Sequence, residues 1–186
     1  MTDLMLHVLD VTMNSVTAGA STVRLGIHER LDEDRLCLYV ADNGPGMSAE
    51  LVQRVLEEFA TTKTKQAGWV GFGLALLRGT VELCDGEFAL QSRVGVGTLV
   101  SATMPHDHPD RPPLGAVAES LQSLHMGVRG VDFCFTHRVD GDGYRLDTRP
   151  VRRMLGAEFE TRAVRNWLVD QLRQGEDALA ARRENR

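Results

Sequence analysis

Two polar side chains near the start of the sequence, Asp10 and Asn14, are four residues apart in a segment otherwise rich in apolar residues. At helical spacing both side chains project from the same face, one turn apart. A carboxylate in that place can act as a general base, and an amide oxygen can ligate a hard cation such as Mg²⁺. The alternative is that both residues lie on the exposed side of an amphipathic helix.

The second group is the run Asp42-Asn43-Gly44-Pro45-Gly46-Met47, which stands between a predicted strand and a predicted helix. A carboxylate at the end of a strand can accept a hydrogen bond from an exocyclic amine. Glycines two residues apart would let a flat aromatic ring approach the backbone closely. The same residues also make a good turn, which is the simpler interpretation.

The third group, Gly71-Phe72-Gly73-Leu74, follows a polar loop that contains Thr61, Thr62, Lys63 and Lys65, the last two being the only lysines in the chain. Glycines before a helix leave free backbone N–H groups at its positive end, which favours a bound phosphate. Taken alone, the loop would be a solvated surface segment and the glycines would be uninformative.

The elements that position these groups follow from the hydrophobic periodicity. The first hundred residues alternate between helix-like and strand-like spacing, with loops at the Gly- and Thr-rich stretches. We predict helices at about residues 3–18, 49–58 and 72–84, and strands at 22–29, 35–41, 87–92 and 98–104. This order predicts an α+β sandwich with helices on one face of a mixed, largely antiparallel sheet.

Three prolines between His106 and Pro113 mark a boundary, so we expect a first domain over residues 1–105, a linker over 106–113 and a small α/β module over 114–186. Within that module the patterns predict a helix at 114–126, a hairpin at 131–147, and helices near 151–155 and 161–174. The charged stretch from Gly175 to Arg186 is expected to fray.

Composition narrows the classes of function. The chain of 186 residues is 42% hydrophobic with a net charge of −5, which suits a soluble globular protein and disfavours nucleic acid as a partner. No run approaches the roughly 18 apolar residues that span a membrane, so we expect a cytoplasmic protein. Cys37, Cys84 and Cys134 are far apart in apolar stretches, which favours buried thiols over a metal cluster.

In this order, the three groups resemble the ATP-binding domain shared by gyrase B subunits, the large heat-shock chaperone, sensor histidine kinases and MutL. This is the GHKL superfamily, with the Bergerat fold, and the resemblance covers about Leu4 to Pro105. It implies that the chain binds ATP as its magnesium complex. One asparagine oxygen is enough for the protein's share of the metal, because Mg²⁺ takes most ligands from phosphate and water.

The resemblance also implies roles for individual residues. Asn14 would hold Mg²⁺, Asp42 would recognise the adenine amine, and Thr98 would help Asp42 through a water molecule. Residues 59–65 resemble the ATP lid. Gly44 and Gly46, before the lid, would shape the wall beside the adenine ring, and Gly71 and Gly73, after it, would bind the triphosphate. The further nucleotide-binding positions are Gly44, Gly46, Met47, Thr61, Thr62, Lys63, Lys65, Gly71, Phe72, Gly73 and Leu74.

Asp10 departs from the pattern, because ATPases of this superfamily carry glutamate four residues before the magnesium asparagine. Aspartate offers the same carboxylate on a side chain that is one methylene shorter. A general base must reach the proton that it takes, so a shorter base can lose much of its rate. We therefore name Asp10 as the candidate catalytic residue.

The whole chain is most similar to small stand-alone GHKL proteins with an extra C-terminal module, some of them encoded near iron-only hydrogenases. The stretches that carry this likeness include Pro113-Leu114-Gly115 and His137-Arg138-Val139-Asp140. One hypothesis is a regulatory ATPase or a protein kinase that resembles anti-sigma-factor kinases. The other is a non-hydrolysing ATP-dependent switch that regulates or matures a redox-enzyme partner.

The module after Pro113 would then offer a surface for that protein partner or for a homodimer. The apolar face predicted for residues 114–126 could equally pack on the nucleotide domain.

Overall fold

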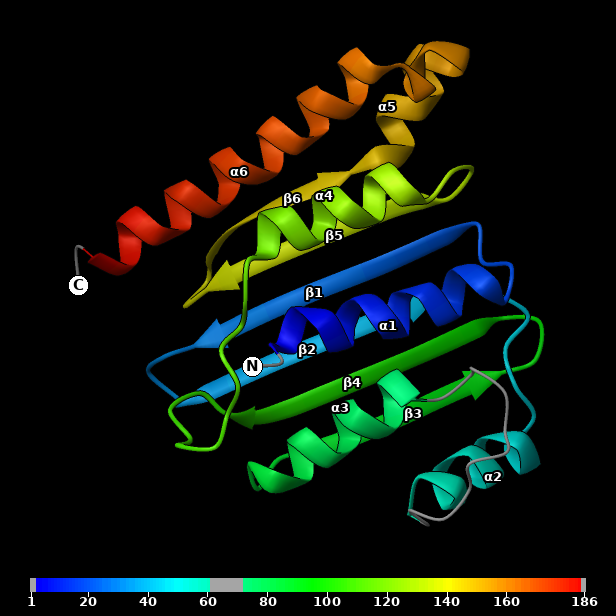
Figure 1. Cartoon of the computed structure of the whole chain (residues 1–186), viewed down its shortest axis with the longest axis vertical. Helices are drawn as coiled ribbons and strands as arrows, with labels where there is room; N and C mark the ends of the chain where they lie inside the picture. The colour runs from blue at the N-terminus through cyan, green and yellow to red at the C-terminus, as the bar shows by residue number, and fades with distance from the viewer. Residues whose placement is uncertain (1–2, 61–71, 185–186) are drawn as a thin grey trace.

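The computed structural model describes residues 3–60 and 72–184. A six-stranded sheet in the order β3-β4-β2-β1-β5-β6 forms one layer, and α1, α3 and α4 lie together on one of its faces (Figure 1). All neighbouring strands are antiparallel except β1 and β5, which are parallel. The predicted α+β class with a mixed, largely antiparallel sheet is confirmed.

The strands are β1 (Thr22–Arg30), β2 (Arg35–Asp42), β3 (Glu87–Arg93), β4 (Gly97–Pro105), β5 (Asp132–Val139) and β6 (Asp142–Asp147). The helices are α1 (Leu4–Thr17), α2 (Ala49–Ala60), α3 (Phe72–Leu83), α4 (Val117–Gly127), α5 (Thr148–Leu155), the 3₁₀ turn η1 (Gly156–Glu160) and α6 (Arg162–Glu184). No helix in the described part of the chain is long and apolar enough to cross a membrane.

Strand β1 lies at the centre of the sheet and alternates between its two faces. Val23, Leu25 and Ile27 are buried in the core beneath the helices. Arg24 and Arg30 lie on the opposite face and are exposed. Because side chains alternate along a strand, the register with the neighbouring strands fixes which residues share each face.

Helix α1 is capped by Asp3, the residue before it, whose carboxylate accepts a hydrogen bond from the Leu6 N–H at 2.9 Å. The two N–H groups that precede Leu6 in the first turn also have partners. Those of Leu4 and Met5 donate to the carbonyl oxygens of Pro113 and Leu114, both at 3.0 Å. The chain at the end of the Pro-rich boundary, more than one hundred residues later, therefore completes the N-terminal cap of α1. This explains why α4 begins at Val117 and not at the predicted residue 114.

The C-terminal elements extend the same sheet and the same core. β5 pairs along all of β1 except its last residue, from Thr22↔Asp132 to Glu29↔Val139. The buried face of α4 belongs to one hydrophobic cluster with residues of α1 and the central strands, and α6 contributes Leu172 to it.

Helix α6 continues past the predicted end at residue 174 to Glu184, so the predicted fraying is wrong for residues 175–184. Gly175 lies against the Tyr144 ring, and a Cβ on this glycine would come within 2.6 Å of the ring carbons. Leu179 is buried one turn later. The glycine serves close packing against β6 and does not end the helix.

A buried polar network joins the first strand to the last helix. His137 is 1% exposed, and its Nε2 and Nδ1 lie 2.8 and 2.7 Å from the carboxylates of Glu29 and Glu176. The second oxygen of Glu29 lies 2.8 Å from His106 Nε2, and the Tyr144 hydroxyl donates to Glu176 at 2.5 Å. These contacts connect β1, the segment after β4, β5, β6 and α6.

Candidate functional site

The Asp42 carboxylate lies at the end of β2 and is oriented by three donors. The Ser15 hydroxyl of α1 donates to Oδ2 at 2.7 Å, and the Gly44 N–H donates to Oδ1 at 2.8 Å. The Thr98 N–H of β4 adds a longer contact to Oδ1 at 3.3 Å. A half-buried carboxylate with this many donors is held in one orientation.

Thr98 is held in turn by Ser92, its cross-strand neighbour on β3. The two hydroxyl oxygens are 2.9 Å apart, and Ser92 also accepts the Met47 N–H at 2.8 Å. Ser92 thus links the loop after β2 to the β3–β4 hairpin. The sequence argument missed this residue. The only signal for it is that the predicted strands at 87–92 and 98–104 end and begin at these two residues, which a tight turn would bring opposite each other.

Gly46 and Gly97 occupy positions where only glycine fits. Gly46 has φ +66°, and a Cβ there would collide with the carbonyl oxygen of Arg93. Gly97 has φ +132°, and a Cβ there would collide with the carbonyl oxygen of Asp42. The loop after β2 therefore lies directly against the β3–β4 turn, with bare backbone on both sides.

On the other side of α1, Asp10 and Gly73 are in contact. Gly73 is the second residue of α3 and is buried, and a Cβ on it would collide with the Cβ of Asp10. Asp10 itself is exposed and Asn14 is half-buried. Within residues 3–60 and 72–184, neither side chain has a hydrogen-bond partner, so both polar ends are available to a ligand.

The other predicted site residues fall into three groups. Leu74 is 9% exposed and belongs to the core, so its contribution to a pocket is structural. Phe72 begins α3, and its side chain is not described. Thr61, Thr62, Lys63, Lys65 and Gly71, with most of the predicted lid, lie outside the described residues.

A groove of about 860 Å³ opens between α2, α3 and β3. Its walls include Val52, Leu56, Phe88 and the guanidinium of Arg78, and it reaches Ser92. Asp10, Asn14 and Asp42 do not line it, so this groove adjoins the polar site without containing it. Among the described residues no cluster of three or more His, Cys, Asp or Glu side chains could hold a metal ion.

Residues 2–108 match the family described as histidine kinase-, DNA gyrase B- and HSP90-like ATPases, and this match covers more than half of the 186 residues. The chain belongs to this family.

Relatives of this GHKL chain include two proteins of Pseudomonas aeruginosa. The sensor protein kinase FleS is 37% identical over 98 residues, which are 53% of this chain and 24% of FleS. The sensor histidine kinase AruS is 33% identical over 102 residues, which are 51% of this chain and 10% of AruS. The GHKL chain thus spans a quarter or less of the length of these relatives.

Among solved structures, the Aquifex aeolicus MutL ATPase domain complexed with ADP resembles this GHKL chain with a TM-score of 0.53. The sequences are 17% identical, and the likeness covers 92% of this chain and 70% of the MutL domain. At that identity the likeness shows the shared fold.

Proposed function

We propose that this GHKL chain binds Mg-ATP, with the adenine amine on Asp42. An ionised carboxylate offers about four lone-pair positions. Ser15, Gly44 and Thr98 occupy three of them in this structure. The position that is left, beside a bare glycine wall, suits one exocyclic N–H donor. This pre-oriented carboxylate is the observation that carries the proposal.

The phosphate end of the nucleotide would lie between α1 and the start of α3. Asn14 presents a half-buried amide without a partner among the described residues, and its oxygen fits the hard-ligand preference of Mg²⁺. The bound ion would neutralise phosphate charge there. The N–H groups at the start of α3, next to Gly73, would face the phosphates.

The reaction we propose is phosphoryl transfer from ATP, as in a regulatory ATPase or a protein kinase of the anti-sigma-factor type. Asp10 would take the proton from the attacking water or hydroxyl, since it lies against Gly73 at the phosphate end. Its exposure leaves room for a nucleophile to reach it.

The alternative is a switch that binds ATP without turnover and is read by a partner protein, for example a redox enzyme that it regulates or matures. The shorter side chain of Asp10 favours this alternative, because it places the base further from the nucleophile than glutamate would. Both versions of the proposal place the protein in the cytoplasm, and both are compatible with a homodimer.

The test is calorimetric titration of the protein with Mg-ATP and with Mg-GTP. GTP presents a carbonyl oxygen where ATP presents the amine, so it should leave Asp42 facing an acceptor and bind at least tenfold more weakly. Asp42→Asn should weaken ATP by about tenfold or more for the same reason. Equal affinities for the two nucleotides would remove Asp42 from adenine recognition.

A second measurement separates the two versions of the proposal. The protein is incubated with labelled ATP and a lysate of its source organism, and both free phosphate and labelled protein are scored. Free phosphate supports an ATPase, a labelled protein supports a kinase, and neither product in the presence of measured ATP binding supports the switch.

A further inference from the structure

A second concave site lies on the face of the sheet that the helices leave open. It has a volume of about 360 Å³, within the usual range for small-molecule sites. Its walls come from the start of β1, the end of β2, the β3–β4 turn and the start of α5. The lining residues are Thr22, Arg24, Ala41, Asp42, Asn43, Val96 and Arg149.

Arg24 supplies a positive charge that nothing in the described chain neutralises. Its side chain is exposed and forms no hydrogen bond or ion pair within residues 3–60 and 72–184. The same is true of the Thr22 hydroxyl, which lies two residues earlier on the same face of β1. Both groups line the concavity and can donate to a ligand.

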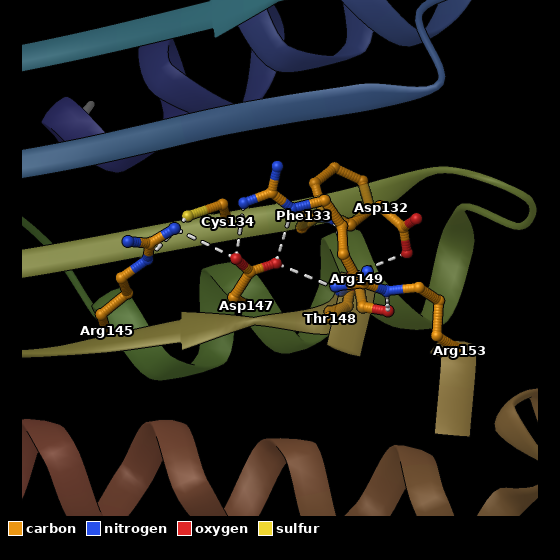
Figure 2. A network of polar contacts seen from close by, with 8 residues as sticks. All are labelled: Asp132, Phe133, Cys134, Arg145, Asp147, Thr148, Arg149 and Arg153. Atoms are coloured by element: carbon orange, nitrogen blue, oxygen red, sulfur yellow. Dashed lines mark hydrogen bonds and ion pairs between the residues drawn. The ribbon is translucent and has the colours of Figure 1, made fainter. Parts of the chain in front are cut away.

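Arg149 also lines the concavity. Its guanidinium is held in place by Asp147 (Figure 2). Its Nε donates to Oδ1 of Asp147 at 2.9 Å, and its Nη2 donates to Oδ2 at 2.6 Å. This fork leaves Nη1 without a partner in the described structure. The guanidinium is therefore pre-oriented, and one edge of it remains free.

The negative charges nearby are already engaged. Asp147 also accepts from Arg145 at 3.0 Å, so one carboxylate serves two arginines (Figure 2). The Asp42 carboxylate is bound by Ser15, Gly44 and Thr98. Three arginines, Arg24, Arg145 and Arg149, stand against two carboxylates, Asp147 and Asp42, which leaves one positive charge in excess. The nearby Asp132 carboxylate is paired separately with Arg152 at 2.7 Å.

The floor of the site is rigid. The Asn43 side-chain oxygen accepts the N–H groups of Ser21 and Thr22 at 3.0 and 2.8 Å. Its amide nitrogen donates to the Ser21 hydroxyl at 2.9 Å. The loop that follows Asp42 is thereby fixed to the start of β1, so a ligand would meet donors that are already in position.

We propose that this concavity is a binding site for a small oxyanion, a phosphate or carboxylate group, held by Arg24, Thr22 and Arg149. Arginine forks match both kinds of group, and a desolvated anion needs several donors at once. The Thr22 and Arg24 side chains project from the face of β1 opposite to the core beneath α1, so these donors are distinct from the groups proposed for the nucleotide, although the lining shares Asp42 with the proposed adenine site.

The test is a titration of the ¹⁵N-labelled full chain with inorganic phosphate, followed by residue-resolved NMR at constant ionic strength. The nucleotide pocket can also take up phosphate, but its signals, at Gly73 and Leu74, are distinct. Binding at the proposed site should produce saturable shifts at residues 22–24, Val96 and Arg149. A parallel titration with acetate separates phosphate from carboxylate selectivity, and chloride reports ionic strength alone.

Arg24→Gln should weaken phosphate at this site by about fivefold or more, because one charge-assisted contact is lost. The matched control is Arg138→Gln, which removes another exposed arginine, located on β5 and on the same face of the sheet but outside the lining of the concavity. Its phosphate affinity should equal that of the parent. Shifts that match the chloride titration, or that survive unchanged in Arg24→Gln, would overturn the proposal. Neither outcome depends on whether the chain binds ATP.

Discussion

Asp10 and Gly73 are in van der Waals contact across the α1–α3 interface, and the missing Cβ of the glycine is what allows it. The contact fixes the distance between the candidate base and the helix end where phosphate would bind. Substitutions of Asp10 and Gly73 therefore test the proposed phosphate end of the site.

If Asp10 is the general base, Asp10→Asn should leave ATP affinity unchanged, because an amide of similar size disturbs neither adenine nor magnesium. Turnover of ATP should fall by about a hundredfold or more. Phosphate release and calorimetric ATP binding measure the two quantities. Unaltered turnover would exclude Asp10 from the mechanism and favour the non-hydrolysing switch.

Two further variants refine that result. Asn14→Ala should impair Mg-ATP binding itself, since the proposed protein ligand of the ion is lost. Asp10→Glu restores the reach of a longer carboxylate, and faster hydrolysis would show that the aspartate limits an otherwise competent ATPase.

Gly73→Ala should destabilise the fold by about 1–3 kcal/mol, because the new methyl group forces α1 and α3 apart. It should also weaken ATP, since the phosphate end of the pocket moves. The control is Gly79→Ala on the same helix, where a Cβ meets no atom within 4 Å. That change should stabilise the helix by about 0.5–1 kcal/mol. Denaturant unfolding compares the two, and an equal response would show that the contact with Asp10 is unimportant.

His137 should make stability depend on pH. Burial lowers the pKa of its imidazole, but hydrogen bonds with Glu176 and Glu29 outweigh this effect and raise the pKa above its usual value. Because the folded state holds the proton more tightly, this contribution is complete below about pH 6.5 and is lost as the pH rises through the folded-state pKa.

Thermal or denaturant unfolding between pH 5 and pH 9 tests this expectation. His137→Gln should flatten the dependence in that window, because the ring that takes up the proton is gone. His28→Gln is the control: burial lowers the pKa of that imidazole, and its side chain lies on the open face of β1. A parent and a His137→Gln variant with parallel curves would contradict the assignment.

A chain truncated after His108 should lose stability or solubility. The cut removes the carbonyl oxygens of Pro113 and Leu114 from the start of α1 and uncovers core residues such as Leu25. Circular dichroism and sedimentation of the truncated chain measure the effect. A soluble, folded fragment that binds ATP with parental affinity would show that the C-terminal elements form a separable partner surface.

Much of the fold followed from the sequence because local spacing determines local structure. The positions of β1, β2, α1 and α3 agree with the apolar periodicity to within a few residues. The pairing of β5 with β1 could not be predicted in this way, since alternation indicates a strand and says nothing about its neighbour. The predicted end of the last helix before Gly175 was wrong for a related reason. The glycine in mid-helix is explained only by its packing against the Tyr144 ring, which is distant in sequence.

The same distinction holds for the candidate site. Asp42 and Gly46 could be singled out because their residue types have few alternatives at those positions. Ser92 could not, since serine is common and its role depends on lying opposite Thr98 and within reach of the Met47 N–H.

The two strands that pair with β1 are synthesised at very different times. β2 follows after a short turn, whereas β5 emerges about one hundred residues later. Closing so long a loop costs more entropy than closing a hairpin, and non-local pairing slows folding. Until β5 pairs with β1, one edge of β1 has unpaired N–H and C=O groups with which a strand of another chain can form hydrogen bonds. We therefore expect a slow folding phase that ends with the docking of β5, and yields of refolded protein that fall as protein concentration rises.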